Sequence, residues 1–262
     1  MEGIILGLYL FNNKNYVMNI TQDVIDSWRK TISEMVPIQN ISNALDIGCG
    51  QGIFSAVLSD MGVDSITGID ISEDILKVAK ENCQDYENIS FLHRSAYETG
   101  LESNQYDLVL ERLVLHHLDN LPKSFQEAYR LLKEGGYFIV QERTPEDIQQ
   151  KGSETHIRGY FFEKFPRLLE TETRLRYESH IIIDLMKKVG FKEVQELRYW
   201  ETKNTYEHKE QLLQALRERK GKKILEELED TELEELIQYI NSSIPEGNTV
   251  EQERSTIWVA VK

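Results

Sequence analysis

The sequence predicts an α/β protein built on a doubly wound, mostly parallel sheet of seven strands. Between residues 44 and 142, short apolar runs alternate with amphipathic segments of helical length, which favours parallel strands joined by right-handed crossovers. The first apolar run, 44–47, enters a loop with glycines at 48, 50 and 52, and an amphipathic run follows from Ile53. Strand, glycine-rich turn and helix in this order predict a ligand site at the carboxyl ends of the strands.

The remaining elements are predicted from hydrophobic periodicity and from the residues that begin and end helices. Ser72 is the expected N-cap of one helix, and Gly135 is the expected C-cap of another. The predicted strands are Ala44–Ile47, Ser65–Asp70, Ile89–His93, Tyr106–Leu110, Gly136–Glu142, Phe191–Trp200 and Ser255–Lys262. The predicted helices are Val24–Met35, Ile53–Met61, Glu73–Cys83, Leu121–Lys133, Ser179–Gly190, Tyr206–Lys220 and Ile224–Ile240.

Composition excludes several classes of partner. The 262 residues suit one large domain, and their formal charge of −15 disfavours nucleic acid and anionic lipid as partners. Two cysteines, Cys49 and Cys83, do not form a disulfide framework, and no Cys/His cluster has zinc spacing. We therefore expect a soluble, cytoplasmic protein without a metal.

The N-terminus leaves two interpretations open. The apolar run Gly3–Phe11 is too short to span a membrane and lacks the features of a signal peptide. It is either a docking segment or upstream translation from a start that is really Met18.

The glycine spacing separates two classes of nucleotide site. Dinucleotide sites use G-x-G-x-x-G, in which a helix N-terminus receives the pyrophosphate. Here Asp46 stands two residues before Gly48, where its charge would repel a pyrophosphate but could orient an ammonium group. Asp70 ends the next apolar run and can accept hydrogen bonds from both hydroxyls of a ribose. The spacing disfavours an NAD-dependent enzyme.

The stretch Asp46-x-Gly48-x-Gly50-x-Gly52 resembles motif I of the class I S-adenosylmethionine (SAM) methyltransferases. Glu111-Arg-Leu-Val-Leu-His-His-Leu-Asp119 similarly resembles motif IV and its extension in the small-molecule members, and Leu131–Glu142 resembles their double-glycine entry to the fifth strand. The family's members that methylate nucleobases or glutamine carry an Asn/Asp-Pro-Pro-Tyr box, and Glu111-Arg-Leu-Val stands in its place. The resemblance implies SAM as cofactor.

By this resemblance, the loop holds the amino-acid end of SAM, Asp70 binds the ribose, and the closing strand lies antiparallel between strands five and six. At residue 95 the family usually has an acid that binds the adenine amino group, and this chain has serine. The resemblance assigns the following residues to the cofactor: Asp46, Gly48, Gly50, Gly52, Asp70, Ile71, Ser95, Ala96 and Glu111.

The rest of the chain differs from its relatives. We expect one domain, 1–262, with a helical N-terminal segment 1–42, a SAM-binding core 43–143 and a C-terminal strand 254–262. Insertions at about 144–178 and 203–245 leave carboxyl ends of strands, so we expect them to form a lid. The candidates for substrate binding are His156, Arg158 and Tyr160, against the alternative that the basic residues offset an acidic surface. Tyr16 and Trp28 are weaker candidates near the cofactor.

Methyl transfer from a sulfonium needs alignment and exclusion of water, and it needs a base only when the acceptor is protonated. The candidate catalytic residues are His116 and His117, which follow strand four, and Glu142, which ends strand five, although each also has a structural interpretation. We expect a methyltransferase that acts on an oxygen or nitrogen of a small molecule. The alternatives are a protein or tRNA base as acceptor, or a SAM-binding protein without catalysis.

Overall fold

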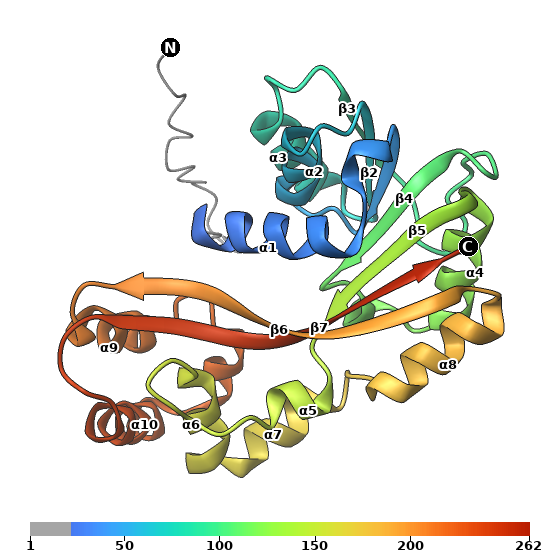
Figure 1. Cartoon of the computed structure of the whole chain (residues 1–262). Helices are drawn as coiled ribbons and strands as arrows, with labels where there is room; N and C mark the ends of the chain where they lie inside the picture. The colour runs from blue at the N-terminus through green and yellow to red at the C-terminus, as the bar shows by residue number, and fades with distance from the viewer. Residues whose placement is uncertain (1–21) are drawn as a thin grey trace.

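The computed structural model describes residues 22–262 (Figure 1). The predicted features Tyr16, Met18 and Gly3–Phe11 lie outside the described residues, as do the first 21 residues of the predicted N-terminal segment. Among residues 22–262, no helix is both long enough and apolar enough to cross a membrane.

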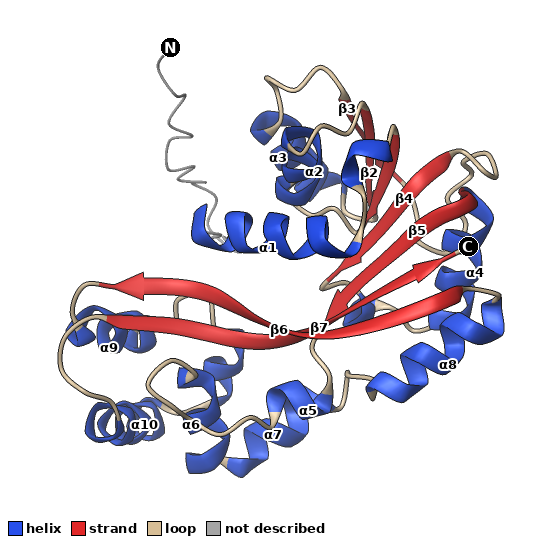
Figure 2. Cartoon of the chain, viewed as in Figure 1, coloured by secondary structure: helices blue, strands red, loops and turns tan. Residues whose placement is uncertain are grey.

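Seven strands form one sheet in the order β3-β2-β1-β4-β5-β7-β6 (Figure 2). β1 to β5 are parallel, and β7 lies antiparallel between β5 and β6, as the resemblance implied. The strands are β1 Asn43–Ile47, β2 Ser65–Asp70, β3 Ile89–His93, β4 Tyr106–Arg112, β5 Leu132–Glu142, β6 Lys192–Tyr206 and β7 Thr249–Val261.

Helices cover both faces of this sheet. α1 and α2 supply Trp28, Ile32 and Leu58 to the apolar core on one face. α4 and α8 supply Phe125 and Met186 to the core on the other face. The described helices are α1 Gln22–Met35, α2 Ile53–Asp60, α3 Glu73–Asn82, α4 Leu121–Leu131, α5 Pro145–Ile148, α6 Ile157–Lys164, α7 Pro166–Thr173, α8 Ser179–Val189, α9 Lys209–Arg217 and α10 Asp230–Ser243, with 3-10 turns η1 Ile38–Asn40, η2 Leu115–His117 and η3 Lys223–Glu227.

The last two strands extend well past the rest of the sheet. β5 pairs with β7 only as far as Thr256, whereas β6 and β7 continue to pair as far as Tyr206 and Thr249. The outer halves of β6 and β7 therefore form a two-stranded arm (Figure 1). The sequence predicted β6 only to Trp200 and β7 only from Ser255.

Helices from both predicted insertions pack together on this arm, and we call them the cap. Its core joins Phe161 of α6, Leu216 of α9 and Leu236 of α10, which are all fully buried. Neither insertion buries this apolar surface alone, so the two segments depend on each other although nearly 30 residues of α8 and β6 separate them in sequence. Residues 144–178 contain no strand, as predicted.

Two local predictions differ from the structure. α4 ends at Leu131 because Leu132 pairs with Tyr106 of β4, and Gly135 is therefore a bend within β5 rather than a helix C-cap. The predicted helix Ile224–Ile240 begins at Asp230, since Lys223–Glu227 forms a 3-10 turn. Ser72 caps α3 as predicted, and its side chain accepts a hydrogen bond from the Ile75 amide.

Candidate functional site

The glycine loop after β1 turns back on β2 and leads into α2. The amides of Gly48 and Cys49 both donate to the carbonyl of Ile69. Gly48, Gly50 and Gly52 have φ values of 71°, 53° and 79°, a left-handed conformation that glycine adopts without steric cost. The loop thus depends on glycine for its backbone path.

The three glycines differ in what surrounds them. A Cβ at Gly48 would lie 2.5 Å from Val114, and one at Gly52 would lie 2.7 Å from Phe91. A Cβ at Gly50 would meet no atom within 4 Å. Gly48 and Gly52 are therefore required by packing within the chain, whereas Gly50 borders open space that a ligand can enter.

Two carboxylates flank this loop. Asp46 is buried and accepts a hydrogen bond of 2.7 Å from Ser55 Oγ. Burial raises its pKa to about 6, although the Ser55 hydroxyl and the charge of Arg112 act in the opposite direction. Asp70 ends β2, and its carboxylate accepts hydrogen bonds from the Gly50 amide at 3.1 Å and the Ser72 amide at 2.9 Å. The structure therefore brings Asp70 against the glycine loop.

The other residues assigned to the cofactor occupy varied positions. Ile71 is 70% exposed directly after Asp70, and Ser95 accepts a hydrogen bond from the Tyr97 amide. Ala96 packs against the sheet core. Glu111 is fully buried, accepts a hydrogen bond from Ser124 of α4, and has a pKa raised to about 7 by burial.

Glu111, which the resemblance assigns to the cofactor, lies on the face of β4 that α4 covers. Side chains alternate across a strand, so Glu111 faces α4 while its neighbour Arg112 faces α2. The guanidinium of Arg112 lies 3.8 Å from the centre of the Phe54 ring and pairs with Glu201. Arg112 is not among the site residues predicted from sequence, and strict alternation along β4 could have identified it.

A second polar cluster lies where β4 and β5 end. Nδ1 of His116 lies 2.7 Å from Glu142 Oε2, and Nη1 of Arg176 lies 2.6 Å from Glu142 Oε1. Glu142 is 3% exposed. Burial alone would raise its pKa, but the hydrogen bond from His116 and the charge of Arg176 lower it overall. Glu142 is thus a buried, ionised partner of His116 rather than a solvated carboxylate.

His117 occupies a different environment. Its ring packs on that of His116 with centroids 4.0 Å apart, and its side chain is exposed. The predicted trio of His116, His117 and Glu142 is therefore brought together, with the imidazole–carboxylate contact made by His116. Arg176 follows α7. Its contact with Glu142 was not predicted from sequence, because 34 residues separate the two.

A cavity of about 1420 Å³ begins at these strand ends and extends beneath the cap. Leu113, His116 and His117 line it on the sheet side, and residues of α7, α9 and η3 line it on the cap side. Of the three predicted substrate-binding residues, Arg158 lines the cavity. His156 packs on Trp200 and Tyr160 packs on Tyr239, and neither side chain lines the cavity.

Trp28, a candidate for the cofactor region, is fully buried under the sheet. Its indole N–H donates to Gln141, which also accepts from Arg112 and donates to Ser255. Trp28 therefore fixes α1 to β5. In residues 22–262 no three His, Cys, Asp or Glu side chains are grouped so as to hold a metal ion.

The sheet order, with β7 antiparallel between β5 and β6, is that of the class I fold of SAM-dependent methyltransferases. Residues 45–140 match the family model described as "Methyltransferase domain".

Comparison with known proteins supports the same assignment. A demethylmenaquinone methyltransferase from Staphylococcus aureus is 30% identical over 134 residues, which cover 50% of this chain and 55% of the relative. The chain thus matches about half the length of its curated relatives.

Solved structures extend the likeness in fold to most of the chain. A proposed methyltransferase from Bacillus halodurans has a TM-score of 0.59 at 15% identity, covering 89% of this chain and 98% of that one. A Haemonchus contortus phosphoethanolamine N-methyltransferase, solved with phosphomonomethylethanolamine and S-adenosylhomocysteine, has a TM-score of 0.55 at 20% identity and covers 90% and 52%.

Proposed function

We propose that this protein is a SAM-dependent methyltransferase that methylates an oxygen or nitrogen of a small molecule held beneath the cap. The observation that carries the proposal is the placement of the His116–Glu142 pair. The pair lies at the carboxyl ends of β4 and β5, on the wall of a large cavity. The glycine loop and Asp70 lie at the same edge of the sheet. Parallel sheets of this kind bind their ligands outside these carboxyl ends.

The residues around the loop fit SAM. Gly50 leaves room for a ligand against the backbone. Asp46 offers a carboxylate for an ammonium group, and Asp70 offers one for ribose hydroxyls. When bound, SAM supplies an activated methyl group whose departure leaves a neutral thioether.

The chain's own contribution is alignment, exclusion of water and removal of a proton. Ionised Glu142 accepts the Nδ1–H of His116, which selects the tautomer of the neutral imidazole whose Nε2 carries no proton. Nε2 can then take a proton from an acceptor hydroxyl or amine. Two free cysteines, Cys49 and Cys83, suit the reducing, cytoplasmic compartment in which we place this activity.

The test is transfer of labelled methyl from SAM to compounds in a cell extract, compared among wild type, His116→Gln and His117→Gln. We expect His116→Gln to lower turnover by about 10²-fold or more while the affinity for S-adenosylhomocysteine stays unchanged. His117→Gln is the matched control because its side chain is adjacent but does not contact Glu142. A larger loss in His117→Gln would refute the assigned base. Tight binding of S-adenosylhomocysteine without any transfer would instead support a non-catalytic SAM-binding protein.

A further inference from the structure

The cavity beneath the cap has an unusually charged wall. Fourteen of the 29 residues that line it are charged, eight of them Lys or Arg and six of them Glu, whereas Val24, Leu113, Leu175, Ala215 and Ile224 are its apolar members. Cavities that bind small molecules are usually lined mainly by apolar and aromatic side chains, with few polar groups. The composition of this wall therefore indicates the kind of molecule that the cavity binds.

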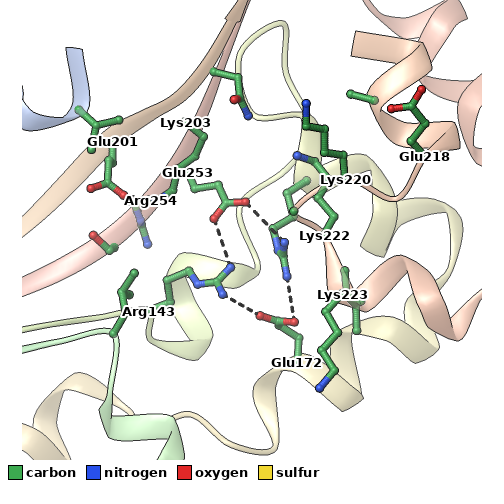
Figure 3. A pocket seen from close by; sticks show the side chains of 18 of the residues that line it. Arg143, Glu172, Glu201, Lys203, Glu218, Lys220, Lys222, Lys223, Glu253 and Arg254 are labelled. Atoms are coloured by element: carbon green, nitrogen blue, oxygen red, sulfur yellow. Dashed lines mark hydrogen bonds and ion pairs between the residues drawn. The ribbon is translucent and has the colours of Figure 1, made fainter. Parts of the chain in front are cut away.

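The middle of the wall is a closed ring of four ion pairs (Figure 3). Arg143 lies 3.1 Å from Glu172 and 3.3 Å from Glu253, and Arg158 lies 2.9 Å and 3.5 Å from the same two carboxylates. Arg143 follows β5, Glu253 belongs to β7, and the other two residues come from cap helices α6 and α7. The ring joins cap to sheet, so these charges are fixed features of the cavity.

The outer part of the wall carries further ionic groups. In the basic run 217–223, Arg217 pairs with Glu234 and Arg219 pairs with Asp230. Lys220 differs, because its exposed side chain lines the cavity and makes no ion pair with any residue from 22 to 262. Figure 3 shows Lys220, Lys222 and Lys223 on the side of the cavity opposite Arg143.

An apolar ligand would be poorly matched to this wall. Filling the space around the ring with hydrocarbon would remove water from paired ions and give them no new partner, which is strongly unfavourable. An ionised ligand supplies hydrogen bonds and charge in place of that water. It can also pair with the ammonium of Lys220.

From these observations we propose that the methyl acceptor is a hydrophilic, ionised small molecule and that the wall excludes lipophilic acceptors such as isoprenoid quinones. This inference rests on the proposed function, since it concerns the acceptor side of the same site. It separates this chain from its curated relatives, which are named for demethylmenaquinone and match only half of it. The cap also lies beyond residues 45–140, which match the family model.

The test measures retention, independently of turnover. The full chain, saturated with S-adenosylhomocysteine, is dialysed against the aqueous metabolite fraction of a cell extract, and separately against its lipid fraction supplemented with demethylmenaquinone. Compounds enriched on the protein side are identified by mass and sorted by ion exchange, which distinguishes anions, cations and zwitterions. We expect enrichment of ionised metabolites from the aqueous fraction and no enrichment from the lipid fraction.

Lys220→Glu shows whether retention occurs in the cavity, and Lys187→Glu is the matched control on the exposed face of α8, outside the lining. Reversal of the Lys220 charge should lower retention of an anion, or raise retention of a cation, by roughly two- to fivefold, and Lys187→Glu should match wild type. Retention of demethylmenaquinone, absence of enrichment from both fractions, or identical behaviour of the two variants would each overturn the inference. If ionised compounds are retained but none accepts a labelled methyl group, the proposed activity fails and the assignment of the cavity stands.

Discussion

Substitution of Arg176 by glutamine tests how the cap holds the proposed base. Nη1 of Arg176 lies 2.6 Å from Glu142 and Nη2 lies 3.3 Å from Glu172, and the side chains of Arg176 and Glu142 are only 6% and 4% exposed. Removal of one partner from a buried pair leaves the other charge uncompensated and typically costs about 3–5 kcal/mol. Glu142 keeps its contacts with His116 and the Arg143 amide, so we expect a loss of about 3 kcal/mol in the free energy of unfolding at pH 7, the lower end of that range.

The pH dependence of this loss has a defined sign. The pKa of Glu142 is lowered below its unfolded value of 4.5, so its ionised form contributes stability that is present above that value and disappears as pH falls through the folded-state pKa. Arg176→Gln weakens this contribution. The difference in stability between wild type and variant should therefore narrow between pH 7 and the acid range below 4.5.

Urea denaturation followed by tryptophan fluorescence at pH 7 and in this acid range measures both quantities. Arg167→Gln is the control, because its pair with Glu232 is equally short at 2.7 Å but has side chains 49% and 30% exposed, and exposed pairs contribute little. Equal losses in the two variants, or a difference for Arg176→Gln that does not change with pH, would refute the view that Glu142 is a buried, ionised group stabilised by the cap.

Three further predictions concern the cofactor side. Asp70→Ala should weaken binding of S-adenosylhomocysteine about tenfold or more, the scale of one hydrogen bond to a charged group, and an unchanged calorimetric affinity would contradict the ribose assignment. Gly50→Val should abolish binding of S-adenosylhomocysteine and lower the free energy of unfolding by about 1–2 kcal/mol, because valine is strained in a left-handed backbone conformation. Gly52→Val should lower the free energy of unfolding further, because its side chain also collides with Phe91. Equal melting temperatures of the two variants would count against this distinction. Since Asp46 has a pKa of about 6, affinity for S-adenosylhomocysteine should fall as pH drops below that value, and Asp46→Asn should remove the dependence; an unaltered pH profile in the variant would exclude Asp46 as its source.

The sequence predicted the sheet and the glycine loop well because both depend on local signals. Apolar runs, glycine spacing and the N-cap at Ser72 lie within a few residues of the structures they specify. His116 and Glu142 could be predicted to meet, since they follow neighbouring strands whose carboxyl ends share one edge of the sheet.

Other features depend on contacts that no local pattern records. The cap core unites two insertions separated by α8 and β6, and the pairing of Arg112 with Glu201 spans 89 residues. The cap packs on the long arm of β6 and β7, a contact that the alternation of residues 200–206 does not reveal. The resemblance gave the position of Glu111 along β4 but not the face of the sheet toward which its side chain points.

The most direct test of the central claim, that the glycine loop and Asp70 form a SAM site, is calorimetric titration of the full chain with S-adenosylhomocysteine and, in parallel, with NAD. We expect saturable binding of S-adenosylhomocysteine to one site per chain, with no heat from NAD. Binding of NAD, or no binding of S-adenosylhomocysteine by a chain that is shown to be folded, would contradict it.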